Sequence, residues 1–299
     1  MLIALPPPQL LEISGADARA FAQAQFSSDV SALETGRWQW SAWLNAQGRV
    51  RAFFHLLRVA DDTLWLLLRG GKAQQLRDAL ARYVLRAKVA LRPVDAMRVF
   101  SVLGDAAIPG VEPAPNTDMI MLLGDGQLCL ALPHERWLLL APVKLVLDAD
   151  DSDEAGNLAL LADIDAGLVS LDPALEETLL PQWLGLDTLG ATSVRKGCYP
   201  GQEVVARLHF KGGVKRGLFR LDYRAATLPA AGAIVRSGEA NGDDAGVVVD
   251  AAWRKPGLAT ALAVLPHDNA DAAAGFSIDE CRVETIAPAT PTRTRSQIE

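Results

Sequence analysis

The chain has 299 residues, of which 50% are hydrophobic and 22% are charged, so it is a globular sequence with room for two or three domains that each bury a core. Its net charge of −7 is unevenly distributed: residues 195–220, here called the basic segment, carry seven Lys or Arg and one Glu, which gives +6 and leaves −13 for the remainder. This balance suits a small anionic ligand and argues against broad nucleic-acid binding. We therefore expect no direct nucleic-acid partner.

The apolar runs are too short to span a membrane, and the N-terminal segment lacks the basic region and cleavage site of a signal peptide. Cys129, Cys198 and Cys281 lie far apart in the chain, which argues against a disulfide framework. Cys129 and Cys281 occur in strand-like apolar runs and are expected in the core. These features predict a cytoplasmic protein without a membrane partner, and we expect a monomer.

The first half of the chain alternates between strand-like runs and two isolated helices. One helix is predicted over residues 16–25, and an amphipathic helix begins at Gly70 and Gly71 and buries a stripe that ends at Tyr83 and Val84. Strands are predicted over residues 37–44, 50–59, 63–68, 97–100, 119–123, 127–132 and 136–141. Strands interrupted in this way are typical of α+β units with antiparallel sheets.

Two loops, near residues 108–115 and 148–157, are the best internal breaks of the chain. The second loop opens an acidic run that we interpret as exposed rather than as a metal site. Asp172 and Pro173 predict another helix start, with the helix ending near residue 180. Short strands with turn residues between them then predict a small β-barrel or sandwich; they cover residues 218–223, 233–236, 246–250, 258–265 and 281–286.

The octet that begins at Lys196, Lys-Gly-Cys-Tyr-Pro-Gly-Gln-Glu, is the most informative motif. A thiolate is the reactive form of cysteine, and the cations Lys196 and Arg207 favour that form of Cys198. Gly197 and Gly201 permit positive φ angles and the close approach of a ligand. The alternative is a tight turn whose cysteine merely packs.

The octet resembles the signature of the YgfZ-like family, folate-binding relatives of the glycine-cleavage T protein that serve iron–sulfur cluster assembly. That signature is a basic residue, Gly, Cys, an aromatic residue, one variable residue and Gly-Gln-Glu, and every fixed position is met from Lys196 to Glu203. Weaker similarities to the family occur at residues 15–18, 25–30, 44–49, 164–167, 180–182, 204–207 and 211–216.

The resemblance implies an α+β fold of the aminomethyltransferase type. In this GcvT-like fold, two α+β antiparallel-sheet domains and a C-terminal β-barrel form a ring around a central pocket, and the second domain interrupts the first in sequence. We therefore expect a folate-binding domain of residues 1–95 with 158–212, an inserted domain of residues 96–157, a barrel of residues 213–287 and a frayed tail of residues 288–299.

The resemblance also implies a ligand, tetrahydrofolate or a related folate. A pterin is flat, and a folate tail carries carboxylates, so aromatic walls and nearby cations suit this ligand. The residues we predict as folate contacts are Trp38, Trp40, Trp183, Lys196 and Arg207.

Within the octet, Cys198 is predicted to be the functional thiol, a transient ligand of iron or persulfide sulfur rather than part of a stable metal site. Tyr199 is expected at the rim of the pocket. Gln202 and Glu203 either belong to the site or hydrogen-bond the turn to the neighbouring domain. No cysteine set in the sequence can hold a whole cluster.

Two functional classes stay open. The first is an accessory factor for assembly or repair of [4Fe–4S] proteins, with client proteins or assembly machinery as partners and an indirect effect on tRNA modification by radical enzymes. The second is a tetrahydrofolate-dependent one-carbon transferase, moving an aminomethyl or methyl group. The aminomethyltransferase has paired aspartates where this chain has Ala52 and Phe53, which cannot accept a proton. This difference favours the first class, which is not a conventional enzyme.

Overall fold

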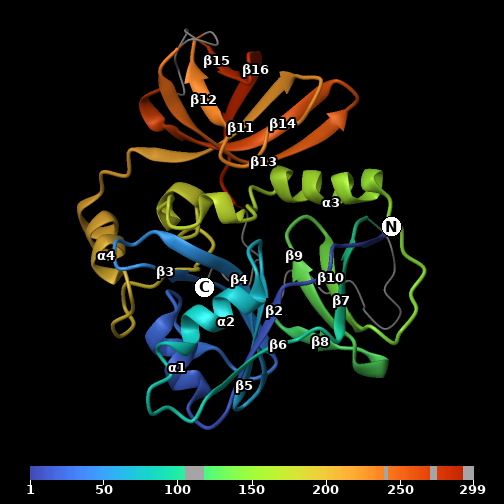
Figure 1. Ribbon diagram of the computed structural model, residues 1–299, viewed down its shortest axis with the longest axis vertical. Coiled ribbons are helices and arrows are strands. Elements are labelled where there is room, and N and C mark those ends of the chain that lie inside the picture. The colour runs from blue at the N-terminus through green and yellow to red at the C-terminus, as the bar shows by residue number, and fades with distance from the viewer. Residues whose placement is uncertain (105–117, 239–241, 270–274, 292–299) are drawn as a thin grey trace.

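The computed structural model describes residues 1–104, 118–238, 242–269 and 275–291. Its strands form two five-stranded sheets and a closed six-stranded barrel, and every pairing between these strands is antiparallel. The barrel lies above the two sheets in Figure 1, with helix α3 (Asp153–Asp165) between it and the second sheet. The expected α+β class, with two antiparallel sheets and a C-terminal barrel, is confirmed.

The first sheet has the strand order β3-β4-β5-β2-β6. Its strands are β2 (Leu10–Ser14), β3 (Arg37–Leu44), β4 (Val50–Ala60), β5 (Thr63–Leu68) and β6 (Ala90–Pro93). Successive side chains of a strand point to opposite faces. Phe53 therefore faces the core shared with the rest of the molecule, whereas Phe54 packs toward the separate core of α1 (Ala18–Gln25) and α2 (Ala73–Ala81).

The second sheet, in the order β1-β7-β10-β9-β8, includes the first strand of the chain. Its members are β1 (Leu2–Ala4), β7 (Met97–Val102), β8 (Ile120–Leu122), β9 (Leu128–Leu132) and β10 (Arg136–Pro142). Because Ile3 lies opposite Ser101, β1 joins residues distant in sequence to this sheet. The predicted loop near residues 108–115 lies outside the described residues.

The acidic run forms helix α3 from Asp153 onward, so the expectation of an exposed loop over residues 148–157 was wrong for its second half, whereas residues 148–152 precede the helix. Ser152 caps the helix, since its hydroxyl accepts a hydrogen bond from the amide of Ala155 at 3.2 Å. Asp153 and Glu154 lie in the first turn, where negative charge interacts favourably with the helix dipole. Acidic residues that suggested a loop therefore start a helix.

The barrel has the strand order β11-β14-β13-β12-β15-β16 and is closed, as predicted. Its strands are β11 (Arg216–Arg224), β12 (Ile234–Ser237), β13 (Asp244–Lys255), β14 (Leu258–Pro266), β15 (Phe276–Ile278) and β16 (Cys281–Pro288). Beyond it, Ala289 packs against the main core, and Pro291 is buried against Gly167 and Gly185. Residues 292–299 of the predicted tail lie outside the described residues.

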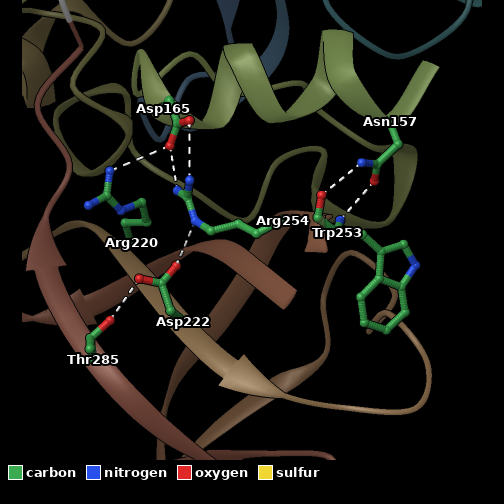
Figure 2. Close-up of polar contacts among 7 residues, drawn as sticks. All are labelled: Asn157, Asp165, Arg220, Asp222, Trp253, Arg254 and Thr285. Carbon is green, nitrogen blue, oxygen red and sulfur yellow. Dashed lines mark hydrogen bonds and ion pairs between the residues drawn. The ribbon is translucent and has the colours of Figure 1, made fainter. Parts of the chain in front are cut away.

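Polar contacts join the barrel to α3 (Figure 2). Arg254 contacts Asp165 at 2.5 Å and Asp222 at 3.3 Å, and Arg220 lies 3.5 Å from Asp165. The carboxylate of Asp222 accepts a further hydrogen bond from the hydroxyl of Thr285 at 2.7 Å. These side chains are partly exposed, so water competes for their charges.

A second contact of α3 with the barrel is a pair of hydrogen bonds between one side chain of the helix and the backbone of β13. The Asn157 side chain donates to the carbonyl of Trp253 and accepts from its amide, both at 2.8 Å (Figure 2). This pair fixes α3 against β13 at a point separate from the ion pairs.

Two further helix predictions need correction. The segment after Asp172 forms only a short 3₁₀ turn, η3 (Pro173–Leu175), because Glu176 leaves the helical region and Glu177 has a φ of 60°. Helix α2 ends at Ala81, and Tyr83, expected on its buried stripe, is 44% exposed. Among the described residues, no helix is both long and apolar enough to cross a bilayer.

Candidate functional site

The octet forms a loop that leads into helix α4 (Gln202–Lys211), which the sequence reading did not predict. Gly201 precedes the helix with a φ of 79°, a conformation that favours glycine. A Cβ at Gly201 would lie 2.6 Å from the carbonyl oxygen of Asn45 and 2.7 Å from the Cα of Gly48. A Cβ at Gly48 would in turn lie 2.8 Å from that of Val204. Two segments that each resemble the family are therefore packed directly against one another.

Lys196 anchors the octet to the end of α1. Its ammonium group donates to the carbonyls of Gln23 at 2.6 Å and Ser28 at 2.9 Å, and also to the carbonyl of Phe26. The last carbonyls of a helix lack partners within it and carry the negative end of its dipole. Burial lowers the pKa of Lys196 to about 8, with Asp29 opposing the shift. The proposed influence of Lys196 on the thiol stays a prediction, whereas its anchoring contacts are direct.

Hydrogen bonds from Tyr199 and Gln202 tie the octet loop to the backbone at Ser193 and Lys196. Tyr199 is buried rather than at a rim, and its hydroxyl donates to the carbonyl of Ser193 at 3.0 Å. Burial raises the pKa of Tyr199 to about 12. The side-chain amide of Gln202 donates to the carbonyl of Lys196 at 3.2 Å. A structural role for Gln202 was one of the two predicted alternatives, and these contacts support it.

Cys198 and the adjacent Gly197 are exposed between these anchored residues. They line a wide shallow hollow of about 500 Å³ together with Arg19 and Gln23 of α1 and with Ser31. The sequence reading did not single out Arg19, because it lies 179 residues away from the cysteine in the chain.

The three cysteines have different environments. Cys129 is buried as expected, and burial raises its pKa to about 12. Cys281 is half-buried beside the barrel core. Cys198 is the exposed member of the three, so its sulfur is the one that a partner or oxidant reaches first.

Glu203 and Arg207 are exposed on α4, four residues apart and therefore on one face of the helix. Neither lies inside the loop that holds Cys198. The structure thus divides the motif into buried anchors at Lys196 and Tyr199, and an exposed part that includes the cysteine.

The tryptophans predicted as folate contacts have unequal environments. Trp38 and Trp40 are buried and meet edge to face with ring centroids 5.4 Å apart, and Trp40 stacks on Phe53 at 5.1 Å. Within the described part of the chain, neither indole N–H has a hydrogen-bond partner. Both residues contribute to a hollow of about 200 Å³ at the edge of β3. Their rings therefore lie mainly in the hydrophobic core.

Trp183, by contrast, is half-buried beside two cations. The guanidinium carbons of Arg49 and Arg216 each lie 5.9 Å from the centroid of its ring. Guanidinium groups at this distance from an indole face are attracted by its negative π surface. The neighbouring Gln182 lines a hollow of about 380 Å³ beside α4.

The structure also reveals a buried charge cluster that sequence reading missed. Asp163 of α3 pairs with Arg69 and with Arg136, both at 2.8 Å. Burial opposes ionisation of Asp163, but the two guanidinium groups outweigh it and hold its pKa below the usual range. Nearby, burial raises the pKa of Asp250 to about 7, although the amide of Ser170 donates to its carboxylate at 2.7 Å.

Comparison with known proteins accords with this architecture. Residues 9–114 match the family model described as the GCVT N-terminal domain. This segment is GCVT-like. The fold as a whole is similar to that of glycine cleavage system aminomethyltransferase T from Bartonella henselae, with a TM-score of 0.68 and 15% sequence identity over 98% of this chain and 86% of that chain. At this identity the likeness shows the fold, and Cys198 lies outside the GCVT-like segment.

Proposed function

We propose that this protein is a folate-binding accessory factor for the assembly or repair of [4Fe–4S] proteins, with Cys198 as its functional thiol. The observation that carries the proposal is an exposed cysteine on a loop whose flanking residues, Lys196 and Tyr199, are buried and hydrogen-bonded. A cysteine held in this way can ligate iron or carry sulfur transiently while a client protein or the assembly machinery takes over the cluster. An effect on tRNA modification then acts through radical enzymes that need a cluster.

The surroundings of Phe53 support an accessory role over aminomethyl transfer. Phe53 is 1% exposed and stacks on Trp40, and Ala52 on the opposite face of β4 is also buried. Neither side chain can move a proton or stabilise a developing cation. A transferase of this fold with these residues would need its acid or base elsewhere.

A folate fits the surroundings of Trp183 better than those of Trp38 and Trp40. The half-buried ring of Trp183 offers a surface for stacking, and Arg49 and Arg216 offer cations for the tail carboxylates. The hollow at Trp38 and Trp40, about 200 Å³, is below the roughly 300–1,000 Å³ of ordinary ligand pockets. Bound tetrahydrofolate would supply a one-carbon carrier, while the residues of this chain bind and orient it.

The test uses cells that lack this gene and express the wild type, Cys198→Ala or Cys281→Ala. Under oxidative stress we expect [4Fe–4S] enzyme activity to fall without the gene, and wild type and Cys281→Ala to restore it. Cys198→Ala is expected to fold but not to restore it. Cluster-independent enzymes serve as controls. Normal cluster enzymes in cells without the gene would refute the accessory role and direct the search to a folate-dependent transfer reaction.

Folate binding is tested separately by titrating the purified protein with tetrahydrofolate and following the ligand by calorimetry. Trp183→Leu is expected to weaken binding roughly tenfold or more, because stacking is lost. Trp137→Leu, in β10, is the matched control and is expected to bind normally. Equal affinity of the wild type and Trp183→Leu would exclude this location for the ligand.

A further inference from the structure

Helix α4 exposes an apolar side chain between cations. Phe210 is 73% exposed, and Arg207 and Lys211 are also exposed. Positions 207, 210 and 211 are three and four residues apart, so they share one face of the helix. Aromatic residues and Arg are enriched in protein interfaces.

A groove runs along the same helix. It has a volume of about 380 Å³ and lies between α4 and the segment that follows Trp183. Apolar side chains supply much of its lining, and Asp187 and His209 are its titratable groups. The apolar residues are Val194, Val205, Leu208 and Val214. A groove of this size and composition can receive an apolar side chain of another molecule.

The charge of this surface contrasts with the rest of the protein. The exposed cations of the basic segment are Arg195, Arg207, Lys211 and Lys215. Glu203 is the single acid of that segment, whereas the remainder of the chain carries −13. Charge complementarity across an interface steers partners and suppresses wrong ones.

We propose that the groove beside α4, together with the exposed cations at the end of the helix, Lys211 and Lys215, forms a docking site for a short acidic segment of a protein partner, with an apolar side chain of that segment in the groove. Electrostatic interactions are screened beyond about 8 Å at physiological salt. A short acidic segment therefore interacts mainly with the local cations. A membrane or a long nucleic acid would extend past them and meet the acidic remainder of the surface.

The proposed docking site is close in the chain to the exposed cysteine. Cys198 lies four residues before the start of α4, so a partner docked on the helix reaches the neighbourhood of the exposed thiol. The docking proposal does not rest on the proposed function, because it depends on the charge and shape of α4 and of the groove beside it. Its failure would leave the roles of Cys198 and of folate standing.

The experiment measures binding of a fluorescent peptide to the full-length protein by anisotropy. The probe has a central Leu flanked on each side by three acidic residues; a second probe has Ser in place of Leu. We expect the Leu probe to bind, and Lys211→Glu to weaken its binding roughly tenfold. The matched control Lys255→Glu reverses an exposed charge on the barrel and is expected to change binding less than twofold.

Leu208→Ser tests the apolar part of the proposal, because Leu208 lines the groove. We expect this variant to bind the Leu and Ser probes equally, whereas the wild type prefers the Leu probe. Circular dichroism and urea denaturation of each variant verify that the overall fold is retained. Undetectable binding of the Leu probe, equal weakening by Lys211→Glu and Lys255→Glu, or tighter binding to anionic phospholipid vesicles or single-stranded RNA than to the peptide would overturn the proposal.

Discussion

The octet loop and the C-terminal barrel are attached to the rest of the molecule by different kinds of contact. The loop is held by a buried ammonium group on carbonyls and by two glycines in close contact, with Lys196 only 8% exposed. The barrel meets α3 through ion pairs whose side chains are much more exposed, 28% for Arg254 and 42% for Asp165. Closely packed groups tolerate little change in side-chain size, whereas water can solvate an exposed charge whose partner is removed. The position of Cys198 should therefore be more sensitive to mutation than the ion pairs between the barrel and α3, which supplement the apolar packing of barrel residues such as Val249 and Ala252 in the main core.

The largest expected effect comes from Gly201→Ala. The new Cβ would strain a backbone with a φ of 79° and lie 2.6 Å from the carbonyl oxygen of Asn45. Strain and overpacking together are expected to lower the free energy of unfolding by about 2–5 kcal/mol. Urea denaturation measures this change.

Gly36→Ala is the matched control for that substitution. Gly36 has a similar φ of 81°, but a Cβ there would have no atom within 4 Å. Only the conformational cost of about 1–2 kcal/mol should remain. Equal losses at the two glycines would show that the contact with the Asn45 turn does not hold the octet in place.

The attachment of the barrel includes a half-buried acid, Asp250, whose ionisation predicts a pH dependence of stability. Burial raises the pKa of Asp250 to about 7 from 3.8, so between about pH 4 and pH 7 the unfolded state loses a proton that the folded state keeps. The folded state then binds more protons, and stability falls as pH rises through this window. Asp250→Asn removes this titration and keeps an acceptor for the amide of Ser170.

We therefore expect the wild type to lose stability relative to Asp250→Asn from pH 4 to pH 7, by an amount on the order of a few kcal/mol. Urea denaturation at a series of pH values measures the difference. If the difference in unfolding free energy between the wild type and Asp250→Asn stays constant across the pH series, then Asp250 has an ordinary pKa in the folded protein.

Most strands of the sheets and the barrel were predictable because alternating apolar residues and turn residues act locally. Strands β1, β2, β6 and β15 were missed, because each is only three to five residues long and shows little alternation. Residues 153–157 of the acidic run were misread, since acids favour both an exposed loop and the first turn of a helix such as α3. Helix α4 was missed because the glycines and Pro200 before it indicated a turn, and Val204 and Val205 favour strands.

The candidate site was predictable in part. The motif drew attention to Cys198, but its sequence gave no sign that Lys196 would be buried on the end of α1. The buried cluster was out of reach, because Asp163 lies 27 residues from Arg136 and 94 from Arg69 in the chain. Such contacts depend on how separate elements pack, which local patterns do not determine.

The smallest expected effect is that of Asp165→Asn, which removes the charge that Arg254 and Arg220 share (Figure 2). Exposed ion pairs contribute about 0–1 kcal/mol, so the loss of unfolding free energy should stay within this range. Raising the salt concentration from 0.1 to 1 M screens exposed charges and should remove most of the difference from the wild type. Asn157→Ala is the internal comparison: it leaves the backbone groups of Trp253 without their partner and should cost about 1–3 kcal/mol with little salt dependence. A larger loss of unfolding free energy in Asp165→Asn than in Asn157→Ala would mean that the ion pairs contribute more to the contact between the barrel and α3 than the hydrogen bonds of Asn157 with Trp253.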